Sequence, residues 1–166
     1  MTTKADFTDE EWTRLKRAPF LAGMAMSLAD PGGPIEAVKE TAATLKSVVA
    51  AADGGSNEAL VQAIASDVRE DARHRHSPMK GYKPSRGANA GVEIVDQLSE
   101  VARLAEAKAS PEEAEDLRSW LLDVAQEAAN AAKEGGFMGF HAERVSDGEQ
   151  QMLDRIGQAL KRPDPA

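Results

Sequence analysis

The sequence contains no cysteine, and aromatic residues make up only 4% of its 166 residues. Without thiols there are no disulfide bonds, no thiolate metal ligands and no cysteine nucleophile. Runs of β-branched residues, which favour strands, are nearly absent as well. Alanine, leucine, glutamate, glutamine, lysine and arginine dominate instead, and these residues favour helices. The composition therefore predicts an all-α protein.

Long apolar runs are also missing. The best candidate lies in "RLKRAPFLAGMAMSLADP", residues 14–31, whose uncharged part is about a dozen residues against the roughly 20 that cross a bilayer. Its basic start imitates a signal peptide, but acidic residues precede it, and Pro19 and Gly23 interrupt it. We expect a buried core helix and no transmembrane segment. Together with the absence of cysteine, this fits a cytoplasmic protein.

Basic residues are outnumbered by acidic ones. The 20 lysines and arginines stand against 28 aspartates and glutamates, which leaves a net charge of −8. A protein of this charge repels phosphates at long range, which argues against nucleic acid as a partner.

Three helix starts carry the same capping-box pattern, in which a hydroxyl residue is followed three positions later by glutamate. They lie at Thr8–Glu11, Ser110–Glu113 and Ser146–Glu149. These starts and the spacing of apolar residues predict a single compact bundle of about six helices. We assign this domain to residues 1–161 and a frayed tail to residues 162–166.

The apolar spacing also predicts which helix faces are buried. The first helix runs from Asp9 toward Leu28, is broken at Pro19 and has a later half that is apolar nearly all round, which makes it the central helix. The second helix, residues 35–52, presents Val38, Ala42, Leu45 and Val49. The fourth helix, residues 91–107, presents Val92, Val95, Leu98, Ala102 and Ala105.

Two outer segments of the chain resemble each other. They are "FLAGMAMSLADPGGPIEAVKETAATL" and "WLLDVAQEAANAAKEGGFMGFHAERVSDGEQQMLDRI". Each contains a helix, an acidic residue before a glycine-rich turn, and an amphipathic helix. This order predicts a pseudo-repeat of two helix-turn-helix units. The alternative is chance, because helical hairpins are common in all-α proteins.

The segments "ADPGGPIEAVKE" and "VSDGEQQMLDRIGQAL" resemble the units of TerB-like tellurite-resistance domains. In that family an Ala-Asp-Gly turn leads to a Ser-x-x-Glu helix start, twice in a compact α-helical fold. Here Pro31 replaces the first glycine, Glu36 is the nearest equivalent of the first glutamate, and Ser146 and Glu149 fit the second start. The whole chain also resembles uncharacterised bacterial helical proteins, a resemblance that supplies no activity.

The TerB-like resemblance implies metal ions at the acidic turn residues and a role in stress-response or membrane-associated complexes. The corresponding residues of this chain are Asp30 and Glu134. Carboxylates are hard oxygen ligands, so calcium, magnesium or manganese is the expected ion.

A basic segment follows the third predicted helix. Residues 74–89 are rich in glycine, proline and basic residues, which predicts a flexible loop. Five residues form a candidate anion-binding loop: Arg73, Arg75, Lys80, Lys83 and Arg86. The alternative is a solvated loop whose charges pair with acidic helices. His74 and His76 lie among these cations and lack a third ligand, which argues against zinc.

The segment "GGFMGF" offers two further hypotheses. Phe137 and Phe140 are too apolar for a solvated connector, so we expect an ordered loop with both rings buried. The alternative is an exposed aromatic contact for a partner or a membrane surface. His141, close to Glu143 in the sequence, forms with it a candidate general acid–base pair, although no nucleophile stands out beside it.

The leading functional hypothesis is a non-enzymatic interaction or ligand-binding domain with an unidentified protein partner and a metal-linked stress-response role. One alternative is a small enzyme that uses His141 with nearby carboxylates. Another is a peripheral membrane protein that uses the basic loop and the two phenylalanines.

Overall fold

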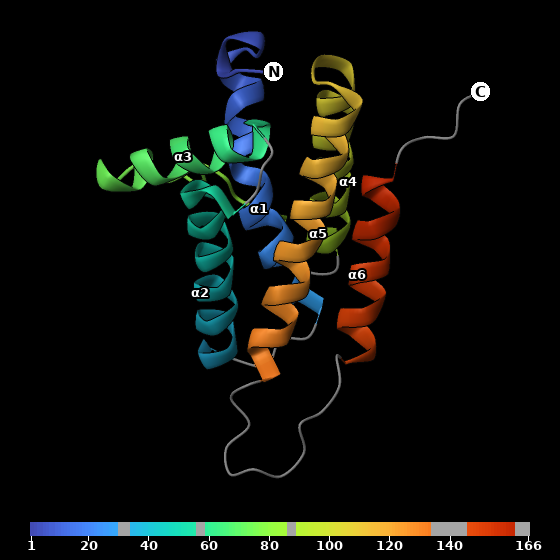
Figure 1. Ribbon diagram of the computed structural model, residues 1–166. Helices are drawn as coiled ribbons and strands as arrows, with labels where there is room; N and C mark the ends of the chain where they lie inside the picture. Colours follow the sequence, from blue (N-terminus) through green and yellow to red (C-terminus); the bar gives the residue numbers. More distant parts are fainter. Residues whose placement is uncertain (30–33, 56–58, 86–88, 134–145, 162–166) are drawn as a thin grey trace, which may run out of the picture.

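The computed structural model describes residues 1–29, 34–55, 59–85, 89–133 and 146–161. These residues form six α-helices and contain no strand, which confirms the predicted all-α bundle (Figure 1). The helices are α1 (Asp9–Ala29), α2 (Pro34–Ala50), α3 (Ala59–Arg73), α4 (Asn89–Lys108), α5 (Pro111–Lys133) and α6 (Asp147–Leu160). A 3₁₀ turn, Lys4–Asp6, precedes α1, and a π-helical turn, Ala51–Gly55, follows α2.

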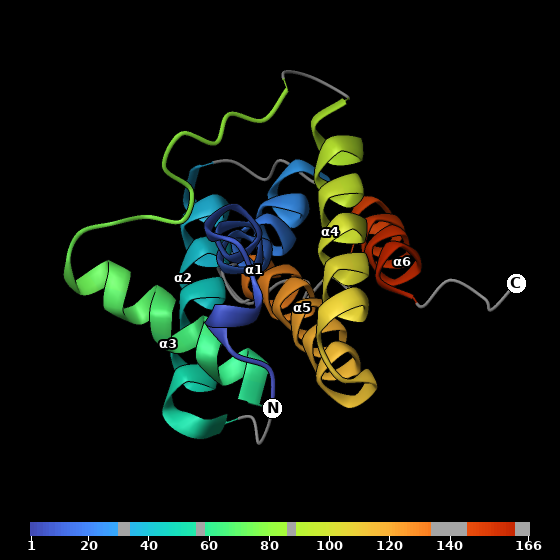
Figure 2. The same cartoon turned by 90° about the horizontal axis from the view of Figure 1, so that it is seen from above.

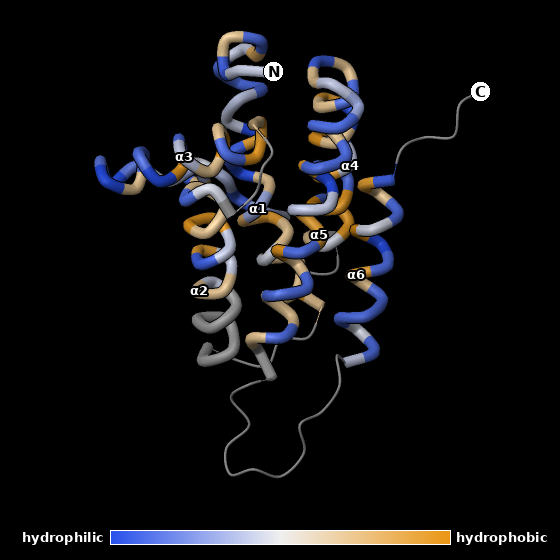
Figure 3. Tube along the Cα trace, viewed as in Figure 1, coloured by the Kyte–Doolittle hydropathy of each residue, from blue (hydrophilic) through white to orange (hydrophobic). Residues whose placement is uncertain are grey.

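Helix α1 lies in the middle of the bundle, as predicted, and α5 shares that position. Each of the two contacts all five other helices, and Figure 2 shows α2 and α3 on one side of α1 and α4 and α6 on the other. Helix α3 lies across the upper end of α2 and points away from the bundle (Figure 1). Hydrophobic and hydrophilic positions alternate along α4 and α6 in Figure 3, as expected of amphipathic helices.

The predicted break of the first helix at Pro19 is wrong. Helix α1 continues from Asp9 to Ala29 through this residue, and Pro19 is buried. An internal proline removes one backbone hydrogen bond and costs about 3 kcal/mol. Packing against helices on every side of α1 offsets that cost, and this packing is a tertiary effect that local sequence does not contain.

All three predicted capping boxes are present. The Ser146 amide donates to Glu149 Oε2 at 2.8 Å, and the Glu149 amide donates to Ser146 Oγ at 3.2 Å. The same reciprocal pair joins Thr8 to Glu11 and Ser110 to Glu113. Each box satisfies two amides that the first helical turn leaves without a partner.

Replacing Ser146 by alanine is expected to lower the free energy of unfolding by about 1 kcal/mol, because the cap of α6 loses its acceptor. Ser119, an exposed serine inside α5, is the matched control. Alanine at that position is neutral or slightly stabilising, since alanine favours helix interiors. Urea titrations of both variants measure the difference. Equal midpoints would argue against a stabilising role for the α6 cap.

The predicted buried face of α2 is wrong by one residue. Leu45 and Val49 are 46% and 45% exposed, whereas Thr44 and Val48 are each 2% exposed. Thr44 is buried because it faces Gly23 of α1, where an added Cβ atom would lie 2.1 Å from Thr44 Oγ1. A small threonine opposite a glycine lets the two helices approach closely, and this fit outweighs the greater hydrophobicity of leucine.

The predicted face of α4 is wrong at one position. Val92 is 52% exposed, and Ile94, which the apolar spacing missed, is fully buried. Val101 is also buried, beside the correctly predicted Leu98. The buried face therefore follows Ile94, Leu98, Val101 and Ala105.

The predicted internal repeat stays a prediction. The two turns that define it, residues 30–33 and 134–145, lie outside the described residues, as does the predicted tail, residues 162–166.

Candidate functional site

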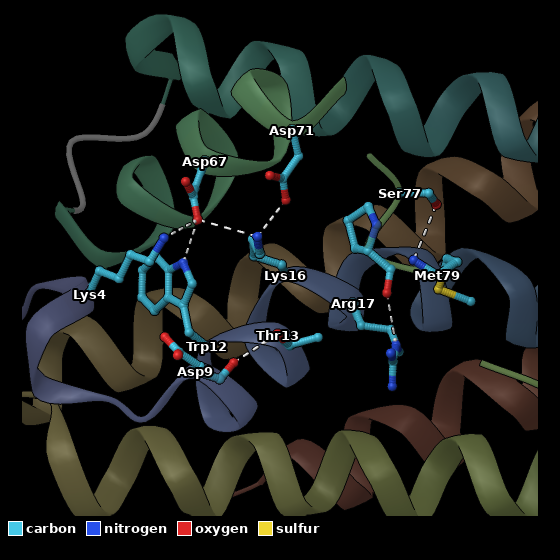
Figure 4. A network of polar contacts seen from close by, with 11 residues as sticks. Lys4, Asp9, Trp12, Thr13, Lys16, Arg17, Asp67, Asp71, Ser77 and Met79 are labelled. Carbon is cyan, nitrogen blue, oxygen red and sulfur yellow. Dashed lines mark hydrogen bonds and ion pairs between the residues drawn. The ribbon is translucent and has the colours of Figure 1, made fainter. Parts of the chain in front are cut away.

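A network of charged side chains joins α1 to α3 (Figure 4). Asp67 Oδ2 accepts hydrogen bonds from Trp12 Nε1 at 2.6 Å and from Lys4 Nζ at 3.1 Å. Lys16 Nζ lies 3.4 Å from the same oxygen and also pairs with Asp71. This network ties α3 to the first half of α1.

The pKa values in this network favour the charged form of both partners. Burial alone would raise the pKa of Asp67, but the bonds from Trp12 and Lys4 and the charge of Lys16 outweigh it and lower that pKa. Burial likewise opposes the charge of Lys16, but the two aspartates raise its pKa above the usual value. A lysine nucleophile or base needs a lowered pKa instead, so these directions indicate a structural ion-pair network.

This network predicts a pH-dependent contribution to stability. Because folding lowers the pKa of Asp67, its contribution is present above the unfolded pKa of about 3.9 and is lost as the pH falls through the folded pKa. Asp67→Asn should lower the free energy of unfolding by about 1 kcal/mol at pH 7. The difference from the unmodified protein should shrink near pH 3. Urea titrations at both pH values measure it, and a difference independent of pH would contradict the electrostatic explanation.

A cleft opens on the opposite side of α1, between α1, α4 and the segment that carries Tyr82. Its volume is about 620 Å³. Leu21 and Val101, both buried, form an apolar floor. The remaining lining residues are polar: Asp9, Glu10, Thr13, Arg14, Arg17, Tyr82, Gln97 and Glu100.

Arg17 holds one wall of this cleft. Its Nε donates to the carbonyl of Pro78 at 3.1 Å (Figure 4), and its guanidinium carbon lies 5.2 Å from the centre of the Tyr82 ring. A guanidinium at this distance from an aromatic ring makes a favourable cation–π contact. Within the part of the chain that the structure describes, no carboxylate pairs with Arg17.

Tyr82 and Gln97 form the neighbouring wall. Gln97 Nε2 lies 3.3 Å from both Tyr82 Oη and Glu93 Oε1. Burial, with the charge of Glu93, raises the pKa of the Tyr82 hydroxyl above its usual range. Hydrogen bonds from Ser85 lower the pKa of Glu93. At neutral pH the tyrosine is therefore a protonated donor and Glu93 is charged.

The opposite end of the cleft is acidic. Arg14 lies between two carboxylates, 2.6 Å from Glu10 Oε1 and 3.6 Å from Glu100 Oε2. All three side chains are largely exposed, so these pairs stabilise the fold little. Their importance is the charge that they place at the cleft entrance.

A second cavity of about 270 Å³ lies between α1, α2 and Met79. Phe20, Met24 and Met79 make it mainly apolar, and Gly23 and Thr44 lie at its inner side. Met79 lines this cavity and Tyr82 lines the cleft, so the short segment that carries both residues lies beside both cavities.

The basic residues predicted to bind an anion do not meet at either cavity. Arg73 ends α3 and pairs with Glu70 at 3.0 Å, while Arg75, Lys80 and Lys83 are exposed. None of these four lines the two cavities, and Arg86 lies outside the described residues. Anion binding by this segment stays a prediction.

The other predicted site residues lie outside the described part of the chain. They are Asp30, Glu134, Phe137, Phe140, His141 and Glu143. Their predicted roles in metal binding, partner contact and catalysis stay predictions. Among the residues that the structure does describe, no group of three or more metal-ligating side chains could hold an ion. In that same part of the chain, none of the helices is both long enough and apolar enough to cross a membrane.

The sequence patterns do not predict the cleft. Tyr82 stands out only as a member of the basic segment, and Arg14, Arg17 and Gln97 carry no motif. Arg14 and Arg17 do lie three residues apart on one face of a helix whose later half is mostly buried. These two arginines on a central helix are the one local sequence signal that points to this face of α1.

No known protein family matches the chain, and neither curated proteins nor solved structures show significant similarity to it. The TerB-like relationship therefore stays a prediction.

Proposed function

We propose that this protein is a non-enzymatic, ligand-binding helical domain and that its binding site is the cleft between α1, α4 and Tyr82. The supporting observation is the combination of the half-buried polar side chains of Arg17, Gln97 and Tyr82 with an apolar floor. Small-molecule sites typically have volumes of about 300–1,000 Å³ and a few polar groups that orient the ligand. The cleft has both features.

The protonation states favour binding over catalysis at this place. General acid–base catalysis needs a group with a pKa near the working pH. The pKa of Tyr82 is raised from 10.0 and that of neighbouring Glu93 is lowered from 4.5, so both shifts lead away from neutrality. Such groups make fixed donors and acceptors for a bound molecule.

The test is an NMR titration of the isotope-labelled protein with a panel of small carboxylates, phosphates and amines. A ligand of the cleft should shift the backbone resonances of Thr13, Arg17, Tyr82 and Gln97 together. Arg17→Gln should abolish these shifts. Arg155→Gln, which changes an exposed arginine on α6 away from the cleft, is the matched control and should bind normally. Unchanged spectra with the whole panel, or undiminished binding by Arg17→Gln, would contradict the proposal.

The metal-linked role is a separate hypothesis with its own test. Calcium, magnesium or manganese should raise the melting temperature of the protein, because an ion that binds only the folded state stabilises it. Asp30→Asn and Glu134→Gln should each remove that increase. Melting curves that do not respond to any of the three ions would remove the hypothesis.

A further inference from the structure

We infer that the cleft selects a small zwitterion, a molecule with an amine at one end and a carboxylate at the other. This inference rests on the proposed function and adds the chemical class of the ligand. It follows from how the charges are distributed along the cleft.

Helices α1 and α4 run in opposite directions along the cleft. Glu11 pairs with Lys108, whereas Arg14, one turn later on α1, reaches back to Glu100 on α4. Moving along α1 from residue 9 to residue 17 therefore means moving along α4 toward Gln97. The carboxylates that line the cleft lie near the start of α1, and Arg17, Tyr82 and Gln97 lie at the other end, where Glu93, which does not line the cleft, is hydrogen-bonded to Gln97.

Arg17 is the group that recognises the carboxylate. Arg14 is committed to Glu10 and Glu100 in the described structure, whereas only one nitrogen of Arg17 is engaged there, by the carbonyl of Pro78. A guanidinium can bind a carboxylate through two parallel hydrogen bonds. Its contact with the Tyr82 ring and its bond to Pro78 hold the guanidinium in place before the ligand arrives.

The acidic end recognises the amine. Asp9, Glu10 and Glu100 line the cleft against only two arginines, which leaves an excess of one negative charge. This excess opposes a dianion such as phosphate, which would meet three carboxylates near the entrance. An ammonium group beside these carboxylates balances the one that the two arginines leave over.

The spacing favours a zwitterion longer than an α-amino acid. Residues 10 and 17 lie about 10 Å apart along the axis of α1, at a rise of about 1.5 Å per residue. The amine and carboxylate of an α-amino acid sit on one carbon and span only a small part of this distance. A linear amino acid with about six carbons, or a molecule of dipeptide length, spans most of this distance.

Three compounds of matched length test the inference: ε-aminocaproate, caproate and hexylamine. The first carries both charges, the second only the carboxylate and the third only the amine. We expect the dissociation constant of ε-aminocaproate, measured by NMR titration at low salt, to be at least about 10-fold lower than those of the other two. A charge-assisted hydrogen bond contributes enough free energy for such a ratio.

Two variants assign the charges to the ends of the ligand. Arg17→Gln should remove the advantage of ε-aminocaproate over hexylamine. The double variant Glu10→Gln/Glu100→Gln should remove its advantage over caproate. Arg155→Gln should leave both ratios unchanged. Glu10 and Glu100 are exposed at the rim, so their replacement leaves the fold intact, and melting temperatures verify this.

The outcomes separate the ligand class from the proposed function. If caproate, hexylamine or inorganic phosphate shifts the cleft resonances with an affinity equal to or above that of ε-aminocaproate, the zwitterion inference is overturned and the ligand-binding function stands. If neither this series nor the wider panel shifts those resonances, both are overturned.

Discussion

Ile94→Ala is expected to lower the free energy of unfolding by about 2–5 kcal/mol. The Ile94 side chain is fully buried in the core between α4 and the rest of the bundle. Truncation removes apolar contacts and leaves a cavity that close-packed neighbours fill only in part, and the cost of large-to-small core substitutions follows from both effects. Guanidinium titrations followed by far-ultraviolet circular dichroism measure the loss.

Val92→Ala is the matched control, because Val92 is an aliphatic β-branched residue on the same helix only two positions away. Its side chain is 52% exposed, and surface substitutions usually change stability by less than about 0.5 kcal/mol. Similar losses for the two variants would mean that α4 is rotated about its axis relative to the described structure.

The difference between Val92 and Ile94 shows why the helices were predictable and their faces were less so. Apolar residues lie on more than one side of α4, so several inward-facing stripes fit the sequence equally well. The choice between them depends on the surfaces that α1, α5 and α6 present to α4, which are properties of the assembled bundle.

Helix starts were predicted well because capping is local. In each box a hydroxyl and a glutamate three residues apart satisfy backbone amides of the same turn, so the whole interaction lies within four residues. Nothing outside the segment decides whether the box forms. The end of the helical segment at Gly54 is equally local. The backbone φ angle there is 87°, which residues with a side chain rarely adopt.

The candidate site depends on residues that are far apart in the sequence. Arg17, Tyr82 and Gln97 come from α1, the segment after α3, and α4. Each is an ordinary residue type in its own segment, and only the tertiary packing of these three segments brings them together. The motifs of the predicted metal site and of the predicted His141 site lie in residues 30–33 and 134–145, outside the described residues, so the structure neither joins nor separates them.

Gly23→Ala is expected to lower the free energy of unfolding by about 2 kcal/mol, although alanine is the better helix former. Inside a helix, alanine is favoured over glycine by about 0.5–1 kcal/mol. A Cβ atom at residue 23, however, would lie 2.1 Å from Thr44 Oγ1 and 3.3 Å from Thr44 Cβ. Relieving this overlap requires the Thr44 side chain to turn or α1 and α2 to separate, and overpacking of this kind costs about 1–3 kcal/mol or more. The clash therefore outweighs the gain in helix propensity.

The same substitution at another glycine, Gly157→Ala, is expected to have the opposite effect on the free energy of unfolding. Gly157 lies inside α6, and a Cβ atom there would meet no atom within 4 Å. Only the helix propensity changes, so this variant should be more stable by about 0.5–1 kcal/mol.

A double-mutant cycle of Gly23→Ala with Thr44→Ala isolates the contact, because removing the threonine hydroxyl and methyl groups makes room for the new Cβ. The double variant should lose less free energy than the sum of the two single variants. Additive losses, or a Gly23→Ala variant as stable as Gly157→Ala, would mean that α1 and α2 do not approach this closely.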